Sequence, residues 1–349
     1  MKAREDNRLI NLMTARMKRV FIPLLVSAGV FGGKKIETLQ FVRVREGRFI
    51  WKVRLSSLLL PSEQLFIKAI PPHKKNILEI ILYKKNPLSL QSFFPAIYHV
   101  GKKYGFYWLV MEELKPLPAP ELCKSDFEER IQLIAALHAK NYNENAVLTN
   151  KEIDWVPRFQ KEWNKRMNKL WLMLQLRKYM RNPKTSKVLT EDYSFLKKMI
   201  YILPSVLKPL LNVPHTVIHG CLTAHHFLAS SNDSRLKLID WATLSFAPFT
   251  IDLVDLIERG IREYASEETQ VSSFRENCIS FYLECLNKQG LNINKGDLKR
   301  WYEITLQFKI VGEIIWIELK KISKGETSKY SWYRNQLRNL FNFPLGEHK

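Results

Sequence analysis

The sequence has few cysteines and no long apolar run, and each shortage excludes a class of protein. Only four of the 349 residues are cysteine, and no two form a Cys-x-x-Cys pair. A disulfide framework and a structural zinc ribbon are therefore not expected, and a reducing compartment such as the cytoplasm is the default. No run of about 18 apolar residues occurs, so the sequence predicts no membrane-spanning helix.

Acidic residues are also scarce, since 34 Asp and Glu face 55 Lys and Arg, a formal net charge of +21. Such an excess attracts anions and says nothing about the fold. The densest basic stretch, 158–187, holds ten basic residues and one acidic residue. It predicts one basic helix whose apolar stripe carries Phe159, Trp163, Met167, Leu170 and Leu174. Its charges are interpreted as a solvated face, with non-specific anion binding as the alternative.

The rest of the composition is typical of a globular protein. Hydrophobic residues make up 46% of the chain and charged residues 26%, which excludes disorder or a collagen-like repeat for the whole chain. No internal repeat and no low-complexity tract occurs. Cys278 and Cys285 stand seven residues apart beside phenylalanines, so core packing is their interpretation. The length allows two packed lobes.

The pattern changes from strands to helices after a proline-rich linker, KPLPAPEL, that follows Leu114. Alternating polarity and turn residues predict strands, and one short helix, ahead of the linker. The strands are expected at 41–45, 49–55, 64–70, 96–101 and 106–111, and the helix at 76–85. We therefore divide the chain into an N-terminal helical segment (1–34), a β-rich lobe (35–114) and a helical lobe (115–349). The predicted class is α+β, with a small antiparallel β-rich N-lobe and a larger helical C-lobe on either side of a cleft.

The stretch that carries chemistry lies at 217–256 and contains VIHGCLTAHHFLAS followed by RLKLIDWATLSFAPFTIDLVDL. It resembles the catalytic region of the aminoglycoside phosphotransferase and choline kinase family, which has the protein-kinase-like fold. In that family HGDxxxxN precedes an apolar strand that ends in Asp, often followed by Trp. Here His219 matches the family histidine, Cys221 stands at the catalytic Asp position, and His226 stands at the Asn position. Asp240 matches the metal-binding Asp.

Other landmarks of the family follow in the expected order over roughly residues 35–320. Lys68 resembles the phosphate-binding lysine and Glu79 its partner on a helix. The segment WLVMEEL resembles the hinge and includes Glu112 and Leu114. The resemblance implies ATP and Mg²⁺ as cofactors, with Asp240 as the metal ligand, and transfer of a phosphoryl group to a hydroxyl.

Four further positions have either a functional or a structural interpretation. Gly47 is the only glycine in the strand-turn-strand that should cover the phosphates, so it marks a nucleotide clamp or an ordinary hairpin turn. His138, in the segment that resembles the family's AALHA helix, is interpreted as structural. Asp252 and His225 are candidates for a displaced base, but Asp252 is better explained as a cap of the helix that starts there.

Two of the three polar positions of the loop are changed. Cys221 offers a neutral thiol with an ordinary pKa of about 8.5, a poor proton acceptor beside a carboxylate. His226 offers a nitrogen where Mg²⁺ prefers oxygen. The sequence therefore favours a degenerate site, with an active phosphotransferase as the runner-up. A zinc site of Cys221, His226 and Asp240, or a Cys-His nucleophile pair, is a remoter alternative.

The sequence thus predicts a kinase-like protein that binds nucleotide or acts as a scaffold, with weak or no phosphotransfer. The alternatives are an active small-molecule phosphotransferase and a binder of nucleic acid or anionic surfaces. Short matches to GRFIWKV and HGxLxxxHFL are similar to the kinase-like proteins associated with bacterial spore coats. The expected location is the cytoplasm or the spore coat, and the substrate or protein partner is unknown.

Overall fold

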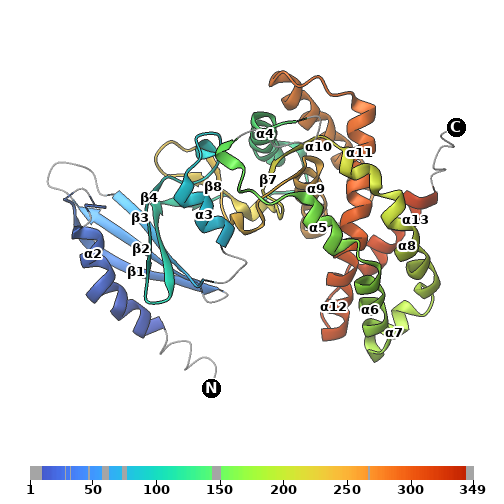
Figure 1. The fold of residues 1–349 in the computed structure, drawn as a ribbon, viewed down its shortest axis with the longest axis horizontal. Coiled ribbons are helices and arrows are strands. Elements are labelled where there is room, and N and C mark those ends of the chain that lie inside the picture. The colour runs from blue at the N-terminus through green and yellow to red at the C-terminus, as the bar shows by residue number, and fades with distance from the viewer. Residues whose placement is uncertain are drawn as a thin grey trace. The chain divides into compact units, whose positions relative to one another are not determined.

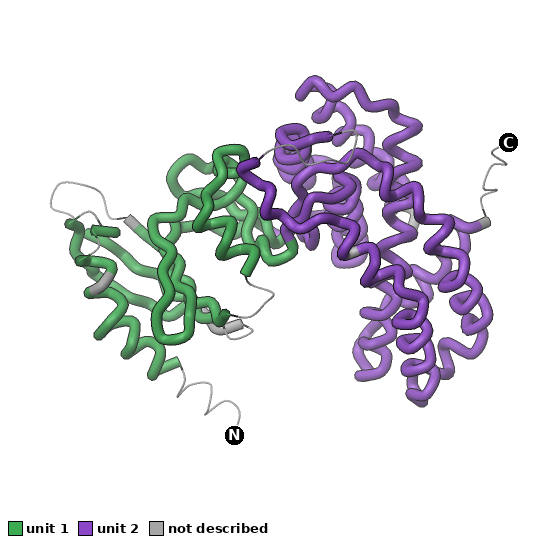
Figure 2. The backbone as a smooth tube through the Cα atoms, in the orientation of Figure 1, with its two compact units in different colours: residues 1–118, 225–243 green, residues 119–224, 244–349 purple. Residues whose placement is uncertain are grey.

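A computed structural model gives the fold of the chain. It describes residues 10–27, 29–31, 33–45, 48–56, 63–72, 77–143, 151–265 and 268–342. The chain forms two compact units, shown in Figure 2: unit 1 is Met1–Pro118 with His225–Thr243, and unit 2 is Ala119–Ala224 with Leu244–Lys349. Within the described ranges, no helix has both the length and the apolar character needed to cross a bilayer.

Unit 1 is built on an antiparallel five-stranded sheet with the order β1-β2-β3-β5-β4 (Figure 1). Its strands are β1 (Lys35–Arg45), β2 (Arg48–Ser56), β3 (Glu63–Ile70), β4 (Ile97–Lys103) and β5 (Phe106–Glu112). In β2 the side chains of Phe49, Trp51, Val53 and Leu55 are buried and alternate with more exposed ones, the period of a strand with one covered face. The predicted β-rich lobe is confirmed.

A helical segment ahead of β1 covers this buried face. It runs from residue 10 through a π-helical turn, Met17–Phe21, into α2 (Ile22–Ser27). Four buried side chains spaced four residues apart pack into the same apolar cluster as the sheet: Met13, Met17, Phe21 and Leu25. The Phe21 ring stacks on Trp108 with centroids 4.1 Å apart. Each such side chain contributes about 1.5–3 kcal/mol by burial, which fixes the helix to the sheet.

Residues 225–243 belong to unit 1 because two short strands pair there. In a three-stranded sheet, β8 (Phe227–Ser230) lies between β6 (Leu114–Pro116) and β9 (Leu236–Leu238). The short turn Trp241–Thr243 then packs against α3 (Ile77–Lys85). The chain thereby brings the segment with Asp240 into the same unit as the five-stranded sheet.

Unit 2 consists of helices around a two-stranded ribbon, in which β7 (His215–Ile218) pairs with β10 (Ser245–Pro248). Helix α4 (Lys124–Lys140) packs against α10 (Glu268–Lys288), and α9 (Thr250–Tyr264) packs against α11 (Lys295–Lys309). The other helices are α5 (Phe159–Arg166), α6 (Lys169–Met180), α7 (Pro183–Leu189), α8 (Tyr193–Val206), α12 (Ile315–Lys324) and α13 (Tyr330–Asn342). Cys278 and Cys285 are buried in α10, as predicted.

The basic stretch 158–187 is not one helix, and that prediction is wrong. The chain forms α5, α6 and the start of α7 there, because two asparagines cap new helices. The Asn168 side chain accepts a hydrogen bond from the Trp171 amide, and the Asn182 side chain accepts from the amides of Lys184 and Thr185. Such a cap supplies an acceptor to amides that have none within the helix, which favours a fresh start.

The apolar stripe predicted for that helix holds only for its first part. Phe159 and Trp163 are buried against Phe308 of α11, which confirms their assignment to the core. Leu170 and Leu174 lie beyond the break and are 70% and 52% exposed. The new direction of α6 turns them away from the core, so that part of the prediction is wrong.

Candidate functional site

The candidate residues are distributed over both units. Unit 1 holds Lys68, Glu79, Glu112, Leu114, His226 and Asp240, and unit 2 holds His219 and Cys221. Gly47 lies outside the described residues, so its role as a clamp or a turn stays a prediction.

Lys68 and Glu79 form an ion pair inside unit 1. Lys68 lies on β3, where its side chain alternates with the buried Ile67 and Ala69 and therefore points away from the N-terminal helix. Its Nζ donates a hydrogen bond to Glu79 Oε1 at 2.8 Å. Glu79 is fully buried on α3, which shields the pair from water. The structure thus brings together the two residues that the resemblance pairs, and their role toward a phosphate stays a prediction.

Glu112 and Leu114 hold the end of the five-stranded sheet to β8. The Glu112 carboxylate accepts hydrogen bonds from the Ala96 amide at 2.8 Å, the Ser230 hydroxyl at 2.5 Å and the Asn232 amide group at 3.1 Å. Leu114 is buried and pairs with Ser230 in the β6–β8 ladder. The Glu112 side chain thereby joins the end of β5 to β8, and the nucleotide-binding role of this segment stays a prediction.

Asp240 follows β9 and has a left-handed backbone, with φ +67°, a conformation that Asp tolerates better than most residues. Its Oδ1 accepts a hydrogen bond from Arg48 Nη1 at 2.8 Å. Burial acts to raise the pKa of Asp240, but the charges of Lys68 and Arg48 outweigh it and lower the pKa below its ordinary value. Asp240 is therefore a carboxylate held between two cations of its own unit.

His226 lies beside this carboxylate. Its backbone carbonyl accepts a hydrogen bond from the Ile239 amide at 3.1 Å, and its charge adds to the lowering of the pKa of Asp240. Among the described residues, no group of three or more His, Cys, Asp and Glu side chains is arranged to hold a metal ion. Cys221 lies in unit 2, whereas His226 and Asp240 lie in unit 1, so the alternative of a zinc site at these three residues stays a prediction.

In unit 2, Asp252 organises the loop that carries His219 and Cys221. Its carboxylate accepts hydrogen bonds from the backbone amides of His219 at 2.6 Å and Gly220 at 2.8 Å. A third contact joins it to His138 Nε2 at 3.3 Å. Burial acts to raise the pKa of Asp252, but these contacts, led by the hydrogen bond with His138, lower it. Asp252 is therefore a buried anion whose two oxygens hold the loop backbone in place.

This arrangement corrects one prediction. Helix α9 begins at Thr250 with Phe249 at the N-cap, and Asp252 is inside its first turn. Asp252 does not cap the helix, because its oxygens face the loop instead. The structural interpretation of His138 agrees with its fully buried position, where Nδ1 lies 2.6 Å from the Tyr282 hydroxyl.

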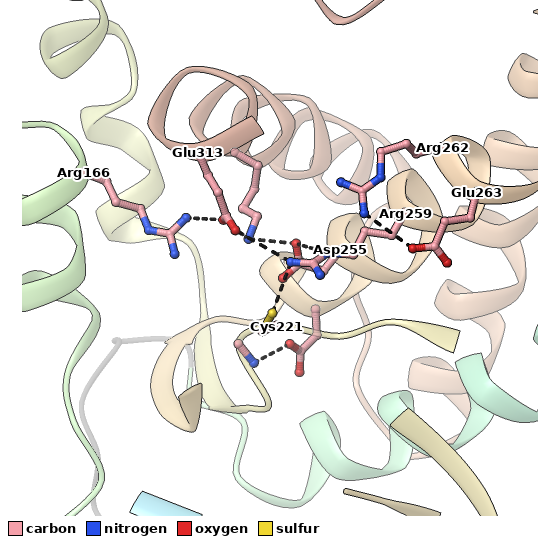
Figure 3. A network of polar contacts seen from close by, with 10 residues as sticks. Arg166, Cys221, Asp255, Arg259, Arg262, Glu263 and Glu313 are labelled. Atoms are coloured by element: carbon pink, nitrogen blue, oxygen red, sulfur yellow. Dashed lines mark hydrogen bonds and ion pairs between the residues drawn. The ribbon is translucent and has the colours of Figure 1, made fainter. Parts of the chain in front are cut away.

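Cys221 lies at the edge of a polar network, which Figure 3 shows. Its Sγ accepts a hydrogen bond from Arg259 Nη2 at 3.2 Å. Burial raises the pKa of the Cys221 thiol, and the nearby Arg259 charge only partly offsets that effect. Arg259 also lies 3.7 Å from Asp255 and 3.7 Å from Glu313. The thiol is thus neutral at pH 7, and a cation rather than a carboxylate faces it.

The rest of the network is a chain of buried ion pairs between helices. Lys309 of α11 is 2% exposed and lies 2.7 Å from Asp255 and 2.8 Å from Glu313. Glu313 also pairs with Arg166. Burial acts to raise the pKa of Glu313, but Lys309 and Arg166 lower it far below its ordinary value. Every charged side chain named in this network has an oppositely charged neighbour.

Sequence reasoning missed Arg48 and the network around Lys309. A partial signal for the network exists, because Asp255 and Arg259, like Lys309 and Glu313, stand four residues apart in helical sequence. This spacing indicates ion pairs along a helix, but it does not say that the pairs are buried or which helices meet. Arg48 has no such signal.

No protein-family model and no curated protein matches the chain. Solved structures do match its fold. An ethanolamine kinase of Plasmodium vivax has a TM-score of 0.54 at 14% identity, covering 87% of this chain and 82% of its own. An aminoglycoside phosphotransferase of Alicyclobacillus acidocaldarius has 0.58 at 10%, covering 87% and 90%.

An amicoumacin kinase, hAmiN, solved with AMP-PNP, Ca²⁺ and Ami, has a TM-score of 0.57 at 12% identity and covers 94% of this chain and 96% of its own. At these identities the likeness shows the fold alone. The chain therefore has the kinase-like fold of the aminoglycoside phosphotransferases and of the choline and ethanolamine kinases.

Proposed function

We propose that this protein binds a nucleotide through its kinase-like fold and transfers phosphate weakly or not at all. The observation that carries the proposal is the state of Cys221. Its sulfur faces the Arg259 guanidinium at 3.2 Å, while Asp252 holds the surrounding loop backbone with short hydrogen bonds. The loop is well formed, but no carboxylate occupies the position that the resemblance assigns to the base.

Phosphoryl transfer to a hydroxyl depends on positioning, on charge neutralisation and on a group that orients the hydroxyl and accepts its proton. A thiol whose pKa burial raises is protonated at pH 7 and accepts hydrogen bonds weakly. Asp252 cannot serve as a displaced base, because both of its oxygens accept hydrogen bonds from the loop. The runner-up, an active phosphotransferase, would need a base that these two residues do not supply.

Nucleotide binding is supported by the cluster in unit 1. The Lys68–Glu79 pair at 2.8 Å presents a charged lysine on the sheet, as the resemblance requires for phosphate binding. The lysine is buried enough for its interaction with an anion to be screened little by solvent. ATP is therefore the proposed ligand, through the side chains of unit 1.

Mg²⁺ does not fit the residues present. It prefers oxygen ligands in near-octahedral geometry. The carboxylate that the resemblance assigns to the metal, Asp240, already forms an ion pair with Arg48 at 2.8 Å. The neighbouring position carries the His226 imidazole, whose nitrogen is a poorer ligand for this ion. We therefore assign no catalytic step to a metal in this chain.

The test measures nucleotide binding and turnover in the same preparation. ATP is expected to raise the melting temperature, because a ligand that binds only the native state stabilises it, while the rate of ATP hydrolysis stays at background. Lys68→Met should abolish the shift, and Lys102→Met, which changes an exposed lysine of β4, should leave it unchanged. A folded protein that shows no shift with ATP, or one with steady turnover, would contradict the proposal.

The association with spore coats and the binding of nucleic acid or anionic surfaces stay predictions of the sequence. Salt dependence distinguishes binding of nucleic acid from binding of nucleotide. Binding of DNA through the surplus of basic residues should weaken steeply as salt rises, whereas binding of ATP to the Lys68 cluster should change less. Tight binding of one DNA sequence at high salt would favour the nucleic-acid alternative.

A further inference from the structure

Arg48 projects from the same face of the five-stranded sheet as Lys68. In β2 the even-numbered residues alternate with the buried Phe49 and Trp51, so Arg48 and Ile50 share the face that the N-terminal helix leaves uncovered. In the ladder between β2 and β3, Ile50 is the partner of Lys68. Arg48 and Lys68 thus project from neighbouring positions of one sheet face.

The Asp240 carboxylate already has a protein cation as its partner. Arg48 Nη1 lies 2.8 Å from Asp240 Oδ1, and the Arg48 side chain is only 15% exposed. Lys68 in turn is paired with Glu79 at 2.8 Å. Each of these two carboxylates is therefore paired with a cation of the chain itself.

We propose that Arg48 takes the place of the divalent cation in this chain, so that the phosphate groups of a nucleotide bind to Arg48 and Lys68 without a metal. This inference rests on the nucleotide binding proposed above. A guanidinium carries five N–H donors in a planar fork that matches the oxygens of a phosphate. A divalent cation would first have to break the ion pair between Arg48 and Asp240, and it would meet two protein cations nearby.

The position of Arg48 also allows a matched control. Arg54 lies on the same strand and on the same face, but it is 48% exposed and its partner, Glu37, is 4.0 Å away. Removal of Arg54 therefore takes the same charge from the same strand without touching the Asp240 cluster. Arg48→Lys provides a second control that keeps the charge and loses the planar fork.

The experiment is titration of ATP by calorimetry in buffer with EDTA and in buffer with Mg²⁺, on the full chain. The wild type is expected to bind with nearly the same Kd in both buffers. Arg48→Gln should weaken binding in EDTA by about tenfold to a hundredfold, the value of charged hydrogen bonds to phosphate, and should bind better with Mg²⁺ than without it. In EDTA the Kd of Arg48→Lys should lie between the values of the wild type and of Arg48→Gln. The Kd of Arg54→Gln should equal that of the wild type.

Binding by the wild type that requires Mg²⁺ would overturn the inference and leave the proposed function standing. Unchanged binding of Arg48→Gln in EDTA would overturn it as well. If Arg48→Gln does not fold, as judged by circular dichroism, the wild type and Arg48→Lys decide the question by the same two criteria. A folded wild type that binds no ATP in either buffer would overturn the proposed function together with this inference.

Discussion

The residues that the resemblance assigns to phosphoryl transfer differ in opposite ways between the two units. In unit 1 the assigned residues Lys68, Glu79 and Asp240 are all present, and Arg48 is paired with the Asp240 carboxylate. In unit 2 the scaffold of the loop is present, and the departure is a missing group, since Cys221 offers a thiol. The cluster with an extra cation is suited to bind an anion, and the loop without a base is poorly suited to catalysis.

The comparison also concerns stability. The loop of unit 2 depends on buried charges, Asp252 and the Asp255–Lys309 pair, which are at most 3% exposed. Buried charges are costly to leave without a partner, whereas exposed pairs contribute little. If the loop serves mainly as a stable scaffold, changes in these residues should reduce stability strongly even where no catalysis is lost.

The largest effect is expected for Asp252→Ala. The change leaves the amides of His219 and Gly220 without their buried acceptor, at a cost of about 3–5 kcal/mol. For a unit of this size the melting temperature should fall by about 10 °C, measured by calorimetry. Asp297→Ala, an exposed acid in the first turn of α11, is the control and should change stability by less than about 0.5 kcal/mol. Equal losses in the two variants would refute the anchoring role.

The next largest effect is the difference in stability cost between removing a buried ion pair and removing an exposed one. Lys309→Met removes the cation closest to Asp255, and one of the cations paired with Glu313, and should cost about 3 kcal/mol or more in unfolding free energy. Lys295→Met removes an ion pair with Glu276 at 3.0 Å, in which the lysine is 58% exposed, and should cost at most about 1 kcal/mol. Urea denaturation followed by fluorescence measures both. A small loss for Lys309→Met would mean that water already solvates this network.

A third prediction concerns the loss of stability at acid pH that a buried histidine in β7, the strand leading into the loop, should cause. Burial, with the charge of Arg158, lowers the pKa of His215 in β7 from 6.5 to about 4. Between those values the unfolded chain binds a proton that the folded chain does not, so stability decreases as the pH falls from 6.5 to 4, by up to about 3 kcal/mol. His215→Leu should remove this part of the pH dependence. Leu in place of the exposed His225 should not alter it.

The smallest effect concerns the reactivity of Cys221. Because burial raises the pKa of the thiol, little thiolate is present at pH 7, and alkylation by iodoacetamide should be at least about tenfold slower than that of glutathione. Peptide mass spectrometry follows the modification, and the urea-denatured chain gives the full rate. Rapid labelling of the folded protein would instead indicate an activated thiol and would revive the Cys-His nucleophile.

The parts of the fold that the sequence predicted are those with a local signal. Alternation along 49–55 marked a strand. The resemblance paired Lys68 with Glu79, and the structure brings these two side chains to 2.8 Å, while their role in a site stays a prediction. The prediction of one helix over 158–187 failed because it followed charge and apolar spacing and gave no weight to the capping asparagines.

Long-range contacts could not be predicted. Arg48 and Asp240 are 192 positions apart, and no periodicity connects a residue at the start of a strand with one after another strand. Asp252 has the same difficulty, because its position near a helix start suggested a cap, while the chain folds the loop amides onto its oxygens. In both cases the partner is set by the tertiary fold.

The most direct test of the account restores, in both units, the residue types that the resemblance expects. The triple variant Arg48→Gln, Cys221→Asp, His226→Asn frees Asp240, introduces a carboxylate beside Arg259 and supplies an amide oxygen. The ATP hydrolysis rate with Mg²⁺ should rise on the order of a hundredfold over the wild type, the scale of a general base, and should rise less when Arg48 is kept. Asp240→Ala in the triple variant should abolish the gain. A wild type as active as the triple variant, or a triple variant that binds ATP with Mg²⁺ and gains nothing, would contradict the account.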